Sequence, residues 1–220
     1  MTQRRRIWQL PVAATPPPPE LEAELSVVRD LTHTLLRAER ADEAFQFALD
    51  RTCPAVGASL GSIFVLDGAS ELMHLAAAHA WPDRWRPWLG EMRVRVGFGP
   101  SGEAASERRV IEVPDVFADP GLEDWQEVAT ELGFRALVAL PLATPHAVLG
   151  AATFYFATPG TPSPRTRALL RAAADLMAAI ADKEALRKRL RHAEAALDDQ
   201  RSAAPARTEV VGEDGEATTG

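Results

Sequence analysis

The sequence predicts an α+β fold in which helices pack against a single, mostly antiparallel sheet. Its strand-like runs follow one another along the chain, and helical periodicity is concentrated near the two ends and in one central insertion. A doubly wound α/β fold would instead alternate strands and crossover helices throughout. These two observations therefore favour one sheet with a helical layer.

Two amphipathic helices are expected before the first strand. In residues 21–39 the apolar positions are separated by gaps of three and four, which is typical of a helix with one buried face; they are Leu21, Leu25, Val28, Leu31 and Leu35. The second helix is EAFQFALDRTCPAVG, residues 43–57. Asp42 is a favourable N-cap for it, and Pro54 and Gly57 indicate its end.

Four short strands are expected in the middle of the chain, over residues 62–67, 71–80, 92–96 and 110–115. A Trp-rich segment, WPDRWRPWLGE (residues 81–91), separates the second strand from the third. Residues 124–133 are expected to form a helix after the fourth strand, with Gly133 at its C-cap.

Residues 136–157 contain no acidic residue, lysine or arginine and reach the length of about 20 residues that spans a bilayer. Pro141 and the turn-like sequence TPHA at residues 144–147 interrupt this run. The second half ends in Thr153, Phe154, Tyr155 and Phe156, which favour strands. Two buried strands joined by a short turn are therefore expected, and no membrane contact.

The chain is divided as follows: a disordered leader over residues 1–20, a helix over 21–39, a domain over 40–183, a helical extension or coiled coil over 184–200, and a disordered acidic tail over 201–220. The last helix begins with Ser163 as N-cap and Pro164 at its first position. The leader imitates a signal peptide, but Gln9 and Pro11 interrupt its short apolar piece.

The stretch GFGPSG, residues 97–102, has the G-x-G-x-x-G spacing of a dinucleotide-binding turn. Such a turn opens a helix that crosses the sheet and precedes an acidic residue by about 20 positions. Here the next strand begins as early as Val110, and Pro100 removes a backbone N–H from the loop. We therefore expect no binding of NAD or ATP, and a tight loop with positive φ that leads into a short helix.

Five motifs occur in a characteristic order: GFGPSGEA, VIEVPDVFADP, GFRALVALPL, AVLGAATFYF and PRTRALLRAAADLMAAIADKEAL. Together they resemble the GAF domain family, a small-molecule-sensing and dimerising module of signalling proteins, over roughly residues 42–183. The resemblance implies a six-stranded antiparallel sheet with helices on both faces and a long C-terminal exit helix. One face would pair the first and last helices, and loops on the other would enclose a ligand pocket.

Several chemistries known in the family find no matching residues in this chain. Relatives that attach a bilin do so through a cysteine, and those that reduce free methionine sulfoxide use several; Cys53 is the single cysteine and is interpreted as a buried structural residue. His74 and His79, five apart on one strand, are expected to point to opposite faces. His192 lacks the surrounding signature of a kinase phosphoacceptor. We therefore expect no enzyme, no cofactor and no metal site.

The candidate ligand site is built on tryptophans. Four of them fall in the two segments that cover the pocket in GAF relatives, where aromatic walls suit a planar ligand. They could equally fill the cavity and make it a solid core. Asp115 and Arg135, at strand ends, could orient a polar ligand or pair with each other. The candidate residues are Trp81, Trp85, Trp88, Phe98, Asp115, Trp125 and Arg135.

The exit helix carries apolar residues near heptad spacing, at Leu169, Leu176, Ile180, Leu190 and Leu197. Pairing with a second copy would bury this stripe, so we expect a homodimer through the terminal helices. The net charge of −7 gives no general attraction to nucleic acid. The single cysteine favours a cytoplasmic location.

The leading hypothesis is a non-enzymatic regulatory sensor module that dimerises, signals to a partner protein and can bind a small planar ligand. Two alternatives remain open. One is a ligand-free scaffold for protein–protein contact. The other is a detached input module of a histidine kinase or similar signalling enzyme.

Overall fold

The computed structural model describes residues 18–67 and 70–203. The chain divides into two units, residues 1–182 and 183–220. The helices and strands are α1 (Pro19–Arg37), α2 (Ala41–Val56), β1 (Leu60–Leu66), β2 (Leu72–His79), α3 (Arg86–Glu91), β3 (Arg93–Arg95), α4 (Gly99–Glu107), β4 (Ile111–Val113), α5 (Gln126–Leu132), β5 (Ala136–Ala143), β6 (Val148–Phe156) and α6 (Pro164–Ala203). Short 3-10 helices cover Asp83–Trp85, Val116–Ala118 and Pro120–Trp125.

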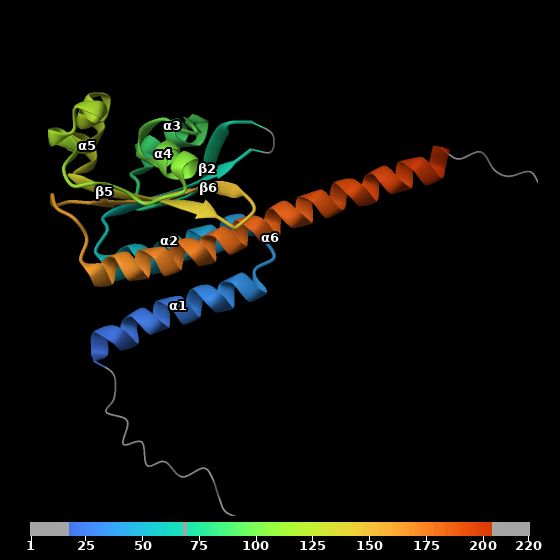
Figure 1. The fold of residues 1–220 in the computed structure, drawn as a ribbon, viewed down its shortest axis with the longest axis horizontal. Coiled ribbons are helices and arrows are strands. Elements are labelled where there is room, and N and C mark those ends of the chain that lie inside the picture. Colours follow the sequence, from blue (N-terminus) through green and yellow to red (C-terminus); the bar gives the residue numbers. More distant parts are fainter. Residues whose placement is uncertain (1–17, 68–69, 204–220) are drawn as a thin grey trace, which may run out of the picture. The chain divides into compact units, whose positions relative to one another are not determined.

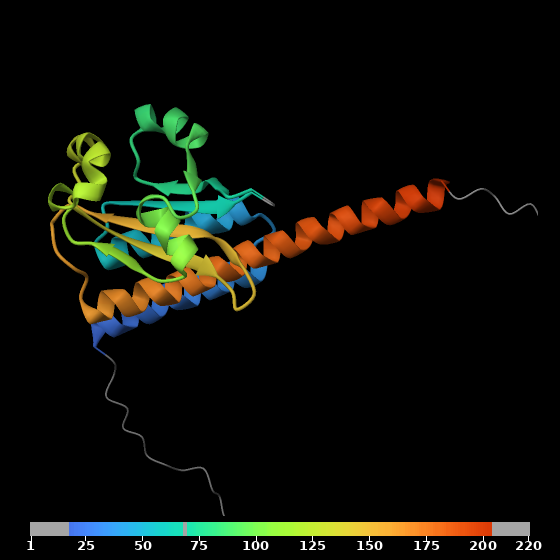
Figure 2. The same ribbon diagram turned by 45° about the horizontal axis from the view of Figure 1, so that its top comes forward.

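The six strands form one antiparallel sheet in the order β3-β2-β1-β6-β5-β4, which confirms the expected fold class. Helix α2 and the first part of α6 lie against one face of this sheet, and α1 packs against α2 on their outer side (Figure 1). Helices α3, α4 and α5 lie over the other face, and the turned view shows the segments around α3 and α5 rising from the sheet as two separate groups (Figure 2). Helices therefore occupy both faces of the sheet.

The helix ends agree with the expected capping residues except at the N-terminus of α2. Gly57 and Gly133 take the left-handed conformation at the C-caps of α2 and α5, and the Ser163 hydroxyl accepts the backbone N–H of Thr166 at 3.0 Å. The prediction of Asp42 as an N-cap is wrong. Helix α2 begins at Ala41, and Asp42 lies in its first turn, where it accepts a hydrogen bond from the Arg40 guanidinium at 3.1 Å.

The apolar stripe of the last helix is divided between two environments. Leu169 and Ile180 are buried within the first unit, against the sheet and its neighbouring helices, so they cannot also pack against a second copy. The expectation of an uncovered stripe fails for these two residues because the domain's own core covers them. In the second unit, Leu186, Leu190 and Leu197 are exposed.

A β-bulge overturns the expected orientation of two histidines. The register of β1 against β2 shifts between Ile63 and Phe64, so that β2 carries one extra residue, Ala76. A bulge of this kind reverses the alternation of side chains beyond it. His74 and His79 therefore lie on the same face, and His79 contacts the Asp50 carboxylate of α2 at 2.6 Å. Among the described residues, no group of three or more His, Cys, Asp or Glu side chains is placed to hold a metal.

The uncharged run of residues 136–157 forms the hairpin β5–β6, closed by a hydrogen bond from the Thr144 N–H to the Ala147 carbonyl at 2.8 Å. None of the helices in the described ranges combines the length and apolar character needed to cross a bilayer. The expected leader and tail fall largely outside the described residues. Helix α1 begins at Pro19 and α6 ends at Ala203.

Gly150 is a first test of this packing. A Cβ at Gly150 would lie 2.0 Å from the Phe64 carbonyl oxygen of the neighbouring strand, whereas a Cβ at Gly90 in α3 would meet nothing within 4 Å. Gly150→Ala is expected to lower the free energy of unfolding by about 1–3 kcal/mol, because backbone must shift to accommodate the methyl group. Gly90→Ala is the control and should be neutral or slightly stabilising. Urea unfolding monitored by tryptophan fluorescence measures both variants. Equal free energies of unfolding for Gly150→Ala and Gly90→Ala would contradict the close approach of the β1 and β6 backbones at Gly150.

The ion pair between Arg167 of α6 and Glu112 of β4 is a second test. Both Glu112 oxygens accept hydrogen bonds from the guanidinium at 2.6 Å, which lowers the carboxyl pKa below its ordinary value of 4.5. A lowered folded-state pKa gives stability that is complete above the unfolded pKa and is lost as the pH falls below it. Arg167→Gln should therefore destabilise the chain at pH 7, and the difference from wild type should shrink below about pH 4.5.

The control for this pH dependence is Arg109→Gln, which removes an exposed pair with Glu107 and should change little at either pH. Urea midpoints at pH 7 and pH 3.5 report both variants. A destabilisation by Arg167→Gln that does not change with pH would show that packing, and not the carboxylate, accounts for the effect.

Candidate functional site

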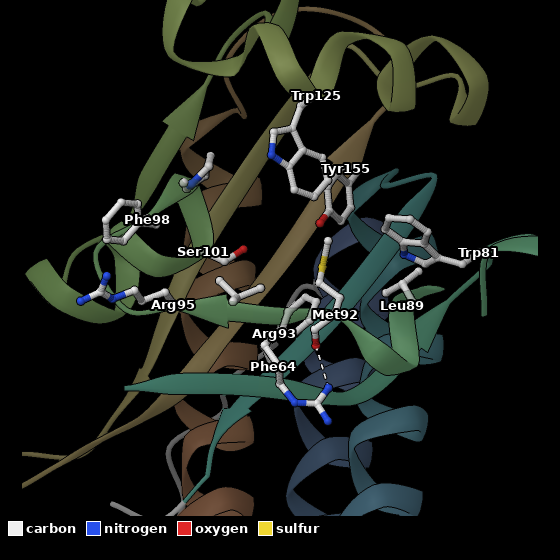
Figure 3. Close-up of a pocket in the computed structure, with 13 residues that line it drawn as sticks. Phe64, Trp81, Leu89, Met92, Arg93, Arg95, Phe98, Ser101, Trp125 and Tyr155 are labelled. Carbon is white, nitrogen blue, oxygen red and sulfur yellow. Dashed lines mark hydrogen bonds between the residues drawn. The ribbon is translucent and has the colours of Figure 1, made fainter. Parts of the chain in front are cut away.

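A cavity of about 400 Å³ lies on the face of the sheet that α3 and α4 cover. Its floor comes from β1 and β6 and its sides from α3, β3, the glycine loop and the 3-10 helix that ends at Trp125 (Figure 3). The described lining residues are Phe64, Trp81, Leu89, Met92, Arg93, Val94, Arg95, Phe98, Gly99, Pro100, Ser101, Trp125 and Tyr155. A volume of this size is within the range of small-molecule sites.

Trp81 is a fixed wall of the cavity. Its indole N–H donates to the Gly61 carbonyl at 3.2 Å, and its ring meets the edge of Tyr155 with the centroids 5.7 Å apart. A buried indole whose N–H is satisfied does not rotate without losing that bond. Trp81 and Trp125 both line the cavity.

Trp85 and Trp88 lie outside the described lining. Their rings meet edge to face with centroids 5.2 Å apart, and Trp88 in turn contacts Trp125 at 6.3 Å. Trp88 is 41% exposed. These two residues therefore support Trp125 from the outside, and a substitution of either would act on the cavity through Trp125.

Two lining residues carry hydroxyl groups, Ser101 and Tyr155, and each is paired with a hydroxyl that lies beneath the described lining. The Ser101 hydroxyl of α4 is 2.7 Å from that of Thr153, and the Ser62 hydroxyl is 3.2 Å from that of Tyr155. Ser62 of β1 and Thr153 of β6 are register partners, so the two pairs lie side by side across the central strands. Ser62, Thr153 and Tyr155 are buried. Burial raises the pKa of Tyr155 to about 12, so its hydroxyl is neutral near pH 7 and able to donate.

The glycine loop forms the rim next to Ser101. Gly97 and Gly99 have φ values of +86° and +63°, which glycine adopts readily, and α4 begins at Gly99 with Pro100 in its first turn. A Cβ at Gly102 would lie 2.3 Å from the Arg95 carbonyl oxygen. These observations confirm a tight loop with positive φ that feeds a short helix. The loop packs against β3, and the next strand follows α4 after a few residues.

The two charged candidates pair with each other away from the described lining. Arg135 donates to the Asp115 carboxylate, with one N–O distance of 3.2 Å, and lies over the Phe117 ring at 5.0 Å. The hydrogen bond from Arg135 lowers the pKa of the Asp115 carboxyl, which also accepts the Phe117 N–H at 3.1 Å. Asp115 and Arg135 therefore pair with each other in this structure, which is one of the two roles expected for them, the other being to orient a polar ligand.

Two other arginines border the cavity but turn their charges away from it. Arg93 and Arg95 flank Val94 on β3, and the half-buried Val94 packs into the core beneath the cavity. The Arg93 guanidinium donates to the Gly90 and Met92 carbonyls at 3.0 and 2.9 Å. The Arg95 guanidinium lies over the Phe98 ring at 5.1 Å. Figure 3 shows both guanidinium groups pointing away from the space below Trp125 and Tyr155.

Cys53 lies in the core on the opposite face of the sheet, among the residues of α2. It is buried, and burial raises the pKa of its thiol to about 12. A thiol in this state is a poor nucleophile. The position agrees with its interpretation as a structural residue.

Sequence reasoning missed most of the floor. Phe64, Leu89, Met92, Val94 and Tyr155 were not among the candidates, and Ser62 and Thr153 support the lining from below. One available signal was the alternation in ATFYF, residues 152–156, which sets two hydroxyl side chains on one face of an otherwise apolar strand.

Comparisons with solved structures place the fold among GAF domains. The GAF domain of a phosphoenolpyruvate-protein phosphotransferase from Coxiella burnetii aligns with a TM-score of 0.66 and 19% identity, covering 76% of this chain and 97% of its own. The corresponding Acinetobacter domain gives a TM-score of 0.61 and 13% identity, covering 75% and 97%.

A free methionine-R-sulfoxide reductase from Neisseria meningitidis, solved in complex with its substrate, aligns with a TM-score of 0.60 and 16% identity, covering 74% of this chain and 93% of its own. A comparison with curated protein sequences gave no match. The family model described as GAF domain matches residues 38–182, close to the range expected from the motifs. The chain therefore belongs to the GAF domain family.

Proposed function

We propose that this chain is a regulatory sensor module that binds a small molecule in the cavity beneath α4. The observation that carries the proposal is the cavity itself: about 400 Å³, with aromatic walls and a hydroxyl-bearing floor, between the sheet and the glycine loop. A few convergent polar groups in an apolar pocket are typical of a ligand site. The Neisseria meningitidis relative, crystallised with its substrate, supports the use of this fold to hold small molecules.

We further propose that the site binds and does not catalyse. The described lining offers aromatic, aliphatic and hydroxyl side chains, while the thiol of Cys53 lies on the other face of the sheet. None of the hydroxyls has a histidine or carboxylate as its recorded partner, as nucleophilic activation of a serine requires. A binding module in a signalling pathway needs affinity and a change of state, which these groups can supply.

The proposed output is a homodimer held by the terminal helices. Leu21, Leu25 and Leu36 of α1 are exposed, and so are Leu186, Leu190 and Leu197 of the second unit. Leu186, Leu190 and Leu197 follow the alternating four- and three-residue spacing of a coiled-coil seam, with Ala193 between the last two. A second copy of the chain would cover these leucines, and ligand binding could then be transmitted through helices to a partner protein.

The ligand proposal is tested on the full chain by native mass spectrometry and thermal shift. Val94→Trp places an indole at the cavity, whereas Leu72→Trp makes a similar enlargement at an exposed position of β2 outside the described lining. A co-purified molecule, or a library compound that raises Tm, should be lost with Val94→Trp and kept with Leu72→Trp. Binding that both variants retain, or the absence of any ligand, would refute the cavity as a sensor site.

The dimer proposal is tested by light scattering on full-length variants. Leu25→Asp and Leu190→Asp each put a charge into a proposed apolar contact and are expected to raise the dimer dissociation constant at least tenfold. Thr130→Asp, on the exposed surface of α5, is the control and should leave the mass unchanged. A wild-type monomer at micromolar concentration, or a dimer indifferent to both leucine substitutions, would contradict this interface.

A further inference from the structure

The charge of the cavity is the first clue to its ligand. Among the described lining residues the charged ones are Arg93 and Arg95. The Arg93 guanidinium donates to backbone carbonyls, and the Arg95 guanidinium pairs with Glu71 at 3.5 Å and lies over the ring of Phe98. An ion buried without a partner of opposite charge is strongly disfavoured. The interior of the cavity therefore provides no side chain that would neutralise a phosphate, a carboxylate or an ammonium group.

The shape of the walls is the second clue. Phe64, Trp81, Trp125 and Tyr155 present aromatic surface from the floor and from two sides of the cavity. Rings of this kind pack best against another planar ring, edge to face or offset. The volume of about 400 Å³ is at the lower end of the range for small-molecule sites, so a compound with one or two rings fits and a large cofactor does not.

The hydroxyl floor is the third clue. A hydroxyl has one proton to donate and two lone pairs that accept, and within the described residues each of the four floor hydroxyls has one recorded hydrogen bond, to another hydroxyl. Each pair uses one of its two protons, so when Ser62 and Thr153 are the donors the protons of Tyr155 and Ser101 remain for a ligand. The floor can thus both donate and accept, and it has no fixed charge.

The N-terminus of α4 also borders the cavity, through Gly99, Pro100 and Ser101. A helix N-terminus carries a partial positive charge that favours oxygen acceptors. Pro100 lacks the N–H that would strengthen it. This edge suits the oxygen of a carbonyl or phenol without supplying the full charge that an ionised group needs.

We propose that the cavity selects an uncharged aromatic compound that carries a hydrogen-bonding group, such as an amide, ketone or phenol hydroxyl, directed at Tyr155 and Ser101. This inference rests on the proposed function, because it names the chemical class of ligand for the same cavity. It sets this chain apart from a site for nucleotides or other anions.

A pair of matched probes tests the class. 4-Hydroxybenzamide and 4-hydroxybenzoate have the same phenol ring. They differ in one substituent, which is a neutral amide in the first and an ionised carboxylate at pH 7 in the second. Calorimetric titration of the full-length protein should give a dissociation constant for the amide at least tenfold lower than for the benzoate. Equal or tighter binding of the benzoate, or no saturable binding of the amide up to millimolar concentration, overturns the proposal.

Variants of the floor test the contact. Tyr155→Phe removes one hydroxyl and keeps the ring, so it should weaken binding of the amide about tenfold. Ser101→Ala should do the same and serves as the second variant if Tyr155→Phe unfolds, which circular dichroism would show. Ser26→Ala on α1 is the control and should leave affinity unchanged. An unchanged affinity in both folded floor variants overturns the contact.

The two proposals can fail separately. If a co-purified or screened anion is lost with Val94→Trp but kept with Leu72→Trp, the cavity is a sensor site and the neutral class is wrong. If neither variant affects any ligand, the sensor site itself is wrong.

Discussion

The rest of the molecule depends on the antiparallel pairing of β1 with β6 at the centre of the sheet. The register joins Ile63 to Ala152 on one face and Phe64 to Ala151 on the other, and both pairs are buried. At Gly150 the two backbones approach so closely that no side chain fits between them. Because side chains alternate along a strand, a slip of one residue would exchange the contents of the two cores. One register therefore fixes the helical core and the cavity together.

That division explains why the chemistry of the two faces differs. Ser62, Thr153 and Tyr155 fall on the cavity side by the alternation of β1 and β6, and the Ser101 hydroxyl reaches Thr153 from α4. Cys53 packs on the opposite side, where a Cβ at Gly61 would lie 2.6 Å from its sulfur. The same alternation on β3 turns Val94 inward and leaves Arg93 and Arg95 on the outer side. The cavity is thus uncharged because of strand parity and not because charged residues are missing from its neighbourhood.

The sequence predicted the architecture well because its signals are local. Gaps of three and four between apolar positions indicated α1. Pro141 and the turn-like TPHA sequence indicated the β5–β6 hairpin, and the short interval from Gly102 to Val110 excluded a crossover helix. The resemblance to GAF domains then implied six antiparallel strands with helices on both faces, whereas the order of the strands came from the structure. The start of α2 was predicted wrongly, because Arg40 occupies the N-cap position expected for Asp42, whereas Gly57 ends the helix as expected.

The site was harder to predict because its geometry is non-local. The bulge at Ala76 places His79 on the same face of the sheet as His74, and no local pattern in the apolar run of β2 predicts this bulge. Trp85 and Trp88 share the segment of Trp81 but not its contact with Tyr155, which comes from a strand about 70 positions further on. The burial of Leu169 and Ile180 likewise depends on the sheet that α6 meets, and not on their heptad spacing.

The open cavity itself constrains what this domain can be. Protein interiors are close-packed, and a dry void lined by apolar groups costs roughly 24 cal/mol for each Å³. The cavity of about 400 Å³ carries hydroxyl groups and opens to solvent at its rim, so water can occupy it and it is not a dry void of this kind. The proposed sensor function accounts for such a space, because solvent would fill it in one state and a ligand in the other.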